Sequence, residues 1–446
     1  MPRQDNFPVA GPIFGEPVFN ESGNPTPDPG AFSTPHPSDT QIYNQIQDLL
    51  TKDVVAFPQM QGQPGDLYSL ATAYGPSGAQ TVQTIQAQGQ ILFHVAGDSG
   101  ASSSRKYADE ISVADALSND IHSLDPSTRH AFLFHVGDLV YDFCETQYWY
   151  DQFYDPFRNY PAPIFAIPGN HDSFVVPNTP AGQEPLTTFI SNFCASQPVV
   201  TQEAGSLHRT AMTQPGVYFA LDAPFVRIIG LFSNALEDPG VISSENGKWA
   251  GVPDFQLAFL TAQLQRVVSE NYTGALIIAM HHPPFSYSPP PNGSGGGGVH
   301  GGSQAMLAQI DTICAAQNVY PHAILSGHAH NYQRYTRSIT FNGSQIQVPF
   351  IIIGNSGHNV NPLTSARAGS PASEPNFGDD VSYLDANPVV QSTGLKIVEF
   401  DDANYGYLSA IATPTRLTIT YNQAGGSGAG PGFTPVTVNL QSHTIS

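Results

Sequence analysis

Five short polar motifs recur along the middle of this chain, and each one follows a short apolar run. The apolar runs are ILFHVA, AFLFHV, PIFAIP, GALIIAM and PHAILS, and the motifs are Gly97-Asp98-Ser99-Gly100, Gly137-Asp138-Leu139-Val140-Tyr141, Gly169-Asn170-His171-Asp172, His281-His282-Pro283 and Gly327-His328-Ala329-His330. Apolar runs of this length, bounded by glycine or proline, predict buried strands. Open α/β sheets keep their active sites in the loops that follow such strands. The series therefore predicts an α/β fold with one site assembled from several strand ends.

The order of these motifs resembles the calcineurin-like metallophosphoesterase superfamily. The resemblance extends from about Ile91 to His330. The spacing Gly-Asp-x-x-Tyr that ends at Tyr141 is similar to the purple acid phosphatase branch, in which this tyrosine ligates a ferric ion. The final motif, GHAHNYQR, and the His300-Gly301 pair after the fourth motif agree with that branch. The resemblance implies a four-layer α/β/β/α sandwich, in which two stacked mixed sheets are flanked by helices.

The chain also departs from the purple acid phosphatase pattern. Ser99 stands where an aromatic residue is usual, and the loop after His281 is longer and rich in proline. Residues 1–88 are too short and too rich in proline for the N-terminal β-sandwich of the plant type. These departures concern the rim of the pocket and the substrate, so they leave phosphomonoesterase and phosphodiesterase as alternatives.

The motifs supply candidate ligands for two metal ions. Two cations about 3.5–4 Å apart need a shared anionic ligand, and Asp138 is the candidate bridge. The ferric ion that the resemblance implies takes Asp98, Asp138, Tyr141 and His330. The second ion, divalent Fe, Zn or Mn, takes Asp138, Asn170, His281 and His328. Neutral ligands at this second position suit a divalent ion that polarises a phosphate oxygen.

The same motifs supply candidate catalytic groups. Two metal ions lower the pKa of a bound water, and the resulting bridging hydroxide attacks phosphorus. His171 adjoins a candidate ligand and is expected to act as general acid or as a donor to the phosphoryl oxygens. Asp172 is expected to orient the His171 imidazole, and His300 is a second candidate acid. The predicted function is phosphate monoester hydrolysis of the acid phosphatase type. The alternatives are a phosphodiesterase acting on nucleotides or lipid headgroups, and a non-catalytic binding protein that its metals stabilise.

Charge and hydropathy limit the partners. The chain of 446 residues has 15 Lys+Arg against 36 Asp+Glu, a net charge of −21. A chain this acidic repels a phosphate backbone, which argues against nucleic acid and leaves a small phosphorylated substrate.

No apolar stretch approaches the roughly 18 residues of a membrane span. The first residues lack an apolar run of signal-peptide length. The low charged fraction of 11%, with 41 Gly and 39 Pro, is compatible with a secreted or periplasmic mature protein.

Composition divides the chain into three segments. Residues 1–88 are expected to form a Pro/Gly-rich arm with one helix at 38–57. Residues 89–360 alternate strands with helices, such as those expected at 108–124 and 255–268, and form the catalytic core. Residues 361–446 begin as a polar loop. They continue with period-2 strands that extend one of the two sheets and complete the sandwich. Nothing in these patterns indicates an oligomeric state.

Structural roles are expected for two further histidines, and two alternatives remain for His358 and for the cysteines. His94 lies within a predicted buried strand and is expected to be a satisfied core histidine, and His130 is expected to be a surface or structural residue. His358 either lines the pocket or occupies a turn. Cys144, Cys194 and Cys314 form no metal-binding pattern. Either Cys144 and Cys194 are joined by a disulfide, or all three are buried thiols.

Overall fold

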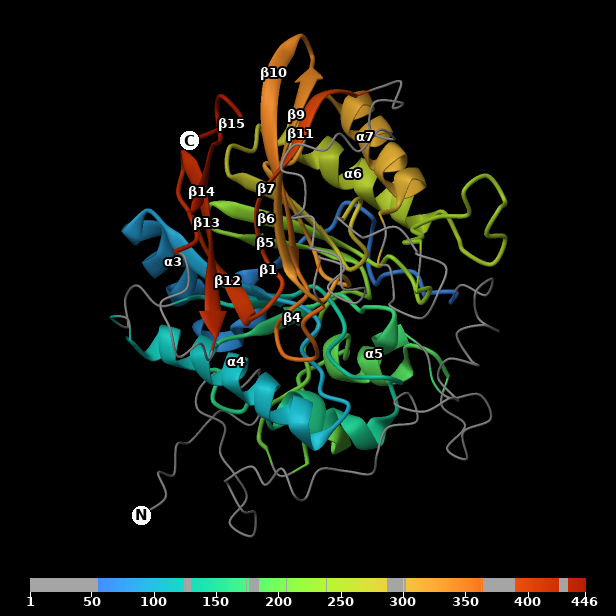
Figure 1. Ribbon diagram of the computed structural model, residues 1–446, viewed down its shortest axis with the longest axis vertical. Helices are drawn as coiled ribbons and strands as arrows, with labels where there is room; N and C mark the ends of the chain where they lie inside the picture. The colour runs from blue at the N-terminus through green and yellow to red at the C-terminus, as the bar shows by residue number, and fades with distance from the viewer. Residues whose placement is uncertain are drawn as a thin grey trace, which may run out of the picture.

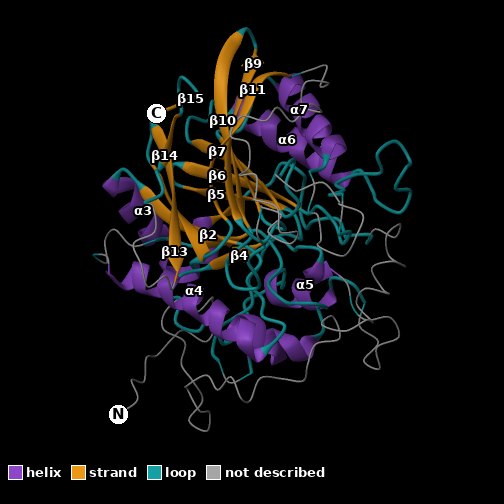
Figure 2. Cartoon of the chain, viewed as in Figure 1, coloured by secondary structure: helices purple, strands orange, loops and turns teal. Residues whose placement is uncertain are grey.

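Two mixed β-sheets pack against each other in the part of the chain that the structure describes, with helices on their outer sides (Figures 1 and 2). The structure is a computed structural model. It describes residues 55–123, 125, 130–173, 175, 184–205, 207–237, 239–286, 300, 302–361, 363, 390–424 and 432–446. The sandwich of two mixed sheets flanked by helices that the resemblance implies is confirmed.

The larger sheet has eight described strands in the order β1-β5-β6-β7-β8-β10-β9-β11. These strands are β1 (Tyr68–Ser69), β5 (Phe219–Ala223), β6 (Val226–Leu231), β7 (Ala275–Met280), β8 (Ala323–Ser326), β9 (Tyr332–Phe341), β10 (Ser344–Ile353) and β11 (Gln391–Asp401). Strands β6, β7 and β8 are parallel neighbours. Every residue of β7 is buried, as a continuous apolar run predicts for a strand covered on both faces.

The smaller sheet has seven described strands in the order β15-β14-β13-β12-β2-β3-β4. These strands are β2 (Ile91–Ala96), β3 (Leu133–His135), β4 (Ile164–Ala166), β12 (Tyr405–Ala412), β13 (Arg416–Ala424), β14 (Val436–Asn439) and β15 (Thr444–Ile445). Strands β2, β3 and β4 are parallel, and the others are antiparallel. The two sheets meet through aromatic side chains. Phe134 and Phe165 of the smaller sheet pack on Phe219 of the larger one, with ring centroids 6.0 and 6.5 Å away.

The described helices are α2 (Leu70–Ala73), α3 (Gly78–Gln88), α4 (Ser104–Ser123), α5 (Thr187–Phe193), α6 (Phe255–Ser269) and α7 (Gln304–Gln317). Helices α3 and α4 pack on the smaller sheet, whereas α6 and α7 pack together beside the larger one (Figure 1). The observed α4 and α6 correspond to the helices expected at 108–124 and 255–268. None of the helices in the described ranges combines the length and apolarity needed to cross a bilayer.

The N-terminal arm lies partly outside the described residues, and the C-terminal strands differ from the sequence prediction. The first residues of the arm, including positions 38–54 of its expected helix, lie outside the described residues. The described part of the arm adds β1, α2 and α3 to the sandwich. The C-terminal strands do not all extend one sheet: β11 pairs with β9 in the larger sheet, and β12 pairs with β2 in the smaller one. A period-2 pattern defines the buried face of a strand but not its neighbour.

All three cysteines are free and buried. The second of the two alternatives therefore holds, and Cys144 is not bonded to Cys194.

Candidate metal centre

The motif residues gather where the carboxyl ends of strands from both sheets meet. Asp98, Asp138 and Asn170 follow β2, β3 and β4, which are parallel neighbours in the smaller sheet. His281 follows β7, and the two histidines of the last motif follow β8, its parallel neighbour in the larger sheet. Parallel strands end at a common edge, so each sheet delivers its ligands to one place. We call the following residues the central site: Asp98, Asp138, Tyr141, Asn170, His281, His328 and His330.

Three of these side chains form one half of the central site. The Tyr141 Oη lies 3.1 Å from Asp98 Oδ1 and 3.1 Å from His330 Nε2, and the last two atoms are 3.5 Å apart. Ligand atoms about 2.1 Å from one ion and at right angles to each other lie about 3 Å apart. The spacing of this triangle therefore fits a single ion.

The other half of the site is built from an amide and two imidazoles. Asn170 Oδ1 lies 3.0 Å from His281 Nε2 and 3.1 Å from His328 Nδ1. The opposite nitrogens of the two rings donate to backbone carbonyls, His281 Nδ1 to Val136 and His328 Nε2 to Glu237. A second hydrogen bond of this kind orients a metal-binding imidazole. The ring nitrogens near Asn170 thus have the spacing of ligands around a second ion.

Asp138 lies between the two halves. Its carboxylate groups with Asp98 and His330 in one potential metal site, and with His281 and His328 in another. The Oδ1 atom accepts the backbone N–H of His171 at 3.0 Å. The buried Oδ2 atom lies 3.3 Å from His281 Nε2 but accepts no hydrogen bond from the described part of the chain. A buried carboxylate oxygen without a donor is unfavourable unless a cation neutralises it, so Oδ2 suits the role of a bridging ligand.

The backbone around the candidate ligands is strained, and glycines beside it leave space for the carboxylates. Asp98, Asp138 and His328 adopt left-handed conformations, with φ of 57°, 57° and 66°. Such values are rare for residues with a side chain, and they gather at functional sites. A Cβ atom at Gly169 would collide with the Asp138 carboxylate, and one at Gly327 would collide with that of Asp98. The glycines of the motifs therefore leave space for the carboxylates.

The buried charges of the central site are balanced by protons when no metal is bound. Burial, reinforced by the nearby Asp138, raises the pKa of Asp98 to about 8. Burial lowers the pKa of His281, but the carboxylates of Asp138 and Asp98 outweigh it and raise this pKa to about 9. At neutral pH both groups hold protons that an arriving metal ion displaces, so binding becomes tighter as the pH rises.

His171 lies beside the ligands, but Asp172 does not orient it as the sequence analysis expected. His171 Nδ1 donates to the backbone carbonyl of Asp142 at 3.0 Å, and the Asp142 carboxylate is 3.8 Å away. Both carboxylate oxygens of Asp172 instead accept backbone N–H groups, from Asp138, Leu139, Val140 and Gly169. Asp172 therefore fixes the loop that carries the candidate bridging residue Asp138. Asp142, which the sequence analysis missed, is the residue that orients the imidazole.

His300 lies next to the second half of the site. Its Nδ1 atom is 3.1 Å from His328 Nε2 and 3.7 Å from the carboxylate of Glu237. Glu237, which also accepts a hydrogen bond from the Asn170 amide at 3.5 Å, is a second residue that the sequence analysis missed. It belongs to none of the five motifs, so no spacing signal could identify it.

His358 belongs to the site rather than to a remote turn. Its ring stacks on that of Tyr141, with centroids 3.5 Å apart and planes inclined by 15°. His358 Nδ1 donates to the carbonyl of Gly100, and Nε2 lies 3.3 Å from Lys106 Nζ. The His358 ring therefore lies between the Lys106 ammonium and the ring of Tyr141, which is a candidate metal ligand.

A two-sheet α/β fold with buried aspartate and histidine groups that could hold metal ions defines the class of this protein. Residues 92–332, more than half of the chain, match the calcineurin-like phosphoesterase family model. The chain belongs to this metallophosphoesterase family. No protein of curated function matches the sequence.

Three solved structures are similar to the chain at low identity. A purple acid phosphatase from yellow lupin (Lupinus luteus) seeds has 15% identity and a TM-score of 0.46, over 78% of this chain and 54% of that one. The chain thus spans about half the length of the lupin phosphatase. PhoD has 13% identity and a TM-score of 0.44, over 80% and 71% of the two chains. GAP50, the anchor in the inner membrane complex of Plasmodium, has 11% identity and a TM-score of 0.46, over 80% and 91%.

Proposed function

We propose that the protein hydrolyses phosphate monoesters with two metal ions at the central site. One observation carries the proposal: two sets of potential ligand atoms, each spaced for one ion, share the Asp138 carboxylate, whose Oδ2 atom accepts no hydrogen bond within the described ranges. A structural metal site needs only one such set. Two sets sharing a carboxylate suit the in-line displacement at phosphorus that two-metal sites promote.

Each ion would have its own ligand set. The set with Asp98, Tyr141 and His330 includes a phenol and a carboxylate, which suit a hard trivalent ion, and we assign it to Fe(III). The set with Asn170, His281 and His328 is neutral, and we assign it to divalent Fe, Zn or Mn. When bound, the two ions would supply an activated water and electrophilic stabilisation of the phosphoryl oxygens. A ferric phenolate would colour the protein, and Tyr141→Phe would bleach it.

His171 is proposed as the proton donor to the leaving group. The Asp142 carbonyl binds the Nδ1 proton, so Nε2 is the atom that can donate a proton. The Asp142 carboxylate lies 3.8 Å from Nδ1, on the side of the ring opposite Nε2. His300, next to His328, is the second candidate acid. Burial lowers the pKa of His300 to about 4, which favours its neutral form at neutral pH.

Hydrolysis of two aryl substrates tests the proposal. The protein is incubated with p-nitrophenyl phosphate and with bis(p-nitrophenyl) phosphate, and Asp138→Asn serves as the metal-site control after its fold is verified by circular dichroism. We expect the monoester to be hydrolysed by the natural chain and not by the variant. Preferential hydrolysis of the diester would replace the proposal with a phosphodiesterase. Hydrolysis of neither would favour a non-catalytic binding protein.

A further inference from the structure

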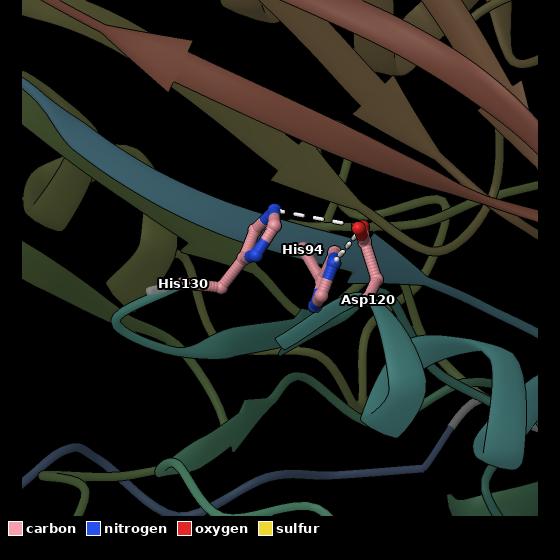
Figure 3. Close-up of side chains that lie close together, drawn as sticks. All are labelled: His94, Asp120 and His130. Atoms are coloured by element: carbon pink, nitrogen blue, oxygen red, sulfur yellow. Dashed lines mark hydrogen bonds and ion pairs between the residues drawn. The ribbon is translucent and has the colours of Figure 1, made fainter. Parts of the chain in front are cut away.

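A second group of metal-ligating side chains lies outside the central site. It consists of His94 on β2, Asp120 on α4 and His130 in the segment before β3, and we call it the peripheral cluster (Figure 3). His94 Nε2 lies 3.0 Å from Asp120 Oδ2, and His130 Nε2 lies 3.8 Å from the same oxygen. We propose that the peripheral cluster binds a divalent ion of the zinc class, with a fourth position open to water.

The donor set matches the chemistry of such an ion. Zinc accepts imidazole nitrogen and carboxylate oxygen, and three protein ligands leave one of its four positions for water. The ligand atoms of the cluster all lie within 4.8 Å of one another. His94 is fully buried and His130 is 6% exposed, whereas the Asp120 side chain is 30% exposed. Asp120 therefore lies on the side from which an ion can enter.

The protonation states of the cluster are those that a metal requires. Burial lowers the pKa of His130 to about 3, and the neighbouring His94 lowers it further. Burial also lowers the pKa of His94, while hydrogen bonding to His94 lowers that of Asp120. At neutral pH the cluster thus offers two neutral imidazoles and one carboxylate. The His94 proton, which Nε2 donates to Asp120 in the absence of an ion, would move to Nδ1, where the Tyr160 hydroxyl can accept it, so that Nε2 can bind the ion without a net loss of protons.

The two imidazoles are held differently. His94 Nδ1 lies 3.0 Å from the Tyr160 hydroxyl, which fixes the ring with Nε2 toward Asp120. His130 Nδ1 is buried and has no hydrogen-bond partner among the residues that the structure describes. A buried polar atom without a partner is unfavourable. Because Nδ1 makes no such hydrogen bond, none is lost at this atom if the His130 ring turns.

Ion binding requires this rotation. The rings of His94 and His130 are stacked, with centroids 3.7 Å apart and planes inclined by 15°. Parallel stacked rings cannot both direct an in-plane lone pair at one ion. A cavity of about 310 Å³, lined by His130, Tyr74, Ile85 and Ala131 among others, lies beside the ring and can accommodate both the rotation and a water ligand. The ion would then connect β2, α4 and the segment before β3.

Zinc binding by the full chain tests this inference. Metal-free protein is dialysed against zinc chloride, and bound zinc is counted by mass spectrometry for the natural chain, His130→Gln and Asp120→Asn. The matched control is His443→Gln. His443 stacks on His322 with centroids 4.6 Å apart, and this pair belongs to no group of potential ligands among the described residues.

We expect His130→Gln and Asp120→Asn to bind one zinc ion fewer than the natural chain and His443→Gln. Zinc should also raise the melting temperature of these two variants less than that of the control. Equal zinc binding by all four proteins would overturn the inference. Asp120 is partly exposed, so Asp120→Asn retains the test if His130→Gln does not fold. The Asp138→Asn variant should still bind zinc at the peripheral cluster, which separates this result from any failure of the central site.

Discussion

The central site and the peripheral cluster use the same kinds of side chain but differ in backbone and in charge. The central ligands occupy loops, and three of them adopt strained left-handed conformations. In the peripheral cluster, His94 and Asp120 lie within a regular strand and a regular helix. Strain of this kind persists only where the surrounding structure enforces it, and it marks functional positions. The comparison shows that residue type alone does not distinguish a reactive site from a stable cluster.

The two regions also differ in the number of buried carboxylates and in the direction in which their pKa values shift. Two buried carboxylates lie close together in the central site, and the pKa of Asp98 is raised to about 8 as a result of burial and of Asp138. The peripheral cluster has one carboxylate, whose pKa is lowered because His94 donates to it. Without metal ions the central site is therefore neutralised by bound protons, whereas the peripheral cluster holds no such added proton and can accept an ion.

The largest expected effect separates the two regions directly. Asp138→Asn removes the shared anionic ligand, so we expect turnover to fall by about 10⁴-fold or more. Asp120→Asn makes the same chemical change in the peripheral cluster and should leave turnover within about twofold, because surface-accessible substitutions away from a site have small effects. Rates with p-nitrophenyl phosphate measure both. A comparable loss in the two variants would remove the distinction between the regions.

A smaller loss is expected from His171→Ala. Removal of a general acid lowers turnover by roughly 10²–10⁴-fold, and the loss should be greatest for an alkyl phosphate, whose alkoxide must be protonated. The loss should be smaller for p-nitrophenyl phosphate, whose phenolate leaves unaided. Steady-state rates on both substrates measure this, with His300→Ala as the comparison. Equal losses on the two substrates for His171→Ala would indicate phosphoryl-oxygen binding instead.

The corrected position of Asp172 gives a third prediction. Asp172→Asn replaces a carboxylate that accepts four backbone N–H groups, and its amide would place an N–H₂ group against some of these donors. Groups that support metal ligands contribute about 10–100-fold to metal affinity or activity. We expect a loss in that range, with the same magnitude for alkyl and aryl substrates. A leaving-group dependence like that of His171→Ala would restore the role in orienting the imidazole.

The smallest expected effect is on the pH dependence of stability. In the unfolded chain a histidine titrates near pH 6.5, whereas burial, reinforced by the neighbouring His94, lowers the pKa of His130 to about 3. Between these values only the unfolded chain binds the proton, so the free energy of unfolding falls as the pH falls from about 6.5 toward 3. One such group adds a slope of about 1.4 kcal/mol per pH unit.

Urea unfolding of the metal-free protein measures this slope. His130→Gln should make it shallower between about pH 6 and pH 4, because one titrating group is lost. The central site behaves in the opposite way. The pKa of His281 is raised to about 9, so its contribution is complete below about pH 6.5 and is lost as the pH rises through 9. An unchanged acid slope in His130→Gln would contradict the lowered pKa.

Much of the fold, and the gathering of the candidate ligands at one place, could be predicted because both depend on local sequence. A buried parallel strand must be apolar along its length, and the loop after it must be polar if it binds cations, so the pattern is visible without a structure. The neighbour of β11 could not be predicted in this way. Alternation along this strand specifies its faces, but its pairing with β9 depends on contacts distant in sequence.

The errors at the site have equally local causes. His171 and Asp172 are adjacent in sequence, but they lie in a 3₁₀ turn, where successive side chains point about 120° apart. Adjacency therefore does not place the carboxylate on the imidazole. His94, Asp120 and His130 come from three separate elements with no motif in common, so only the packed structure brings them together.

The metal content of the purified protein tests the central claim, that Asp138 is shared by two ions, most directly. The count is made by mass spectrometry on His130→Gln, in which the peripheral cluster is disabled, and on the same protein with Asp138→Asn added. The account predicts two ions per chain in the first protein. It predicts no more than one in the second, because both ligand sets lose their common anion. Two ions in both proteins, or one ion in the first, would contradict the shared ligand.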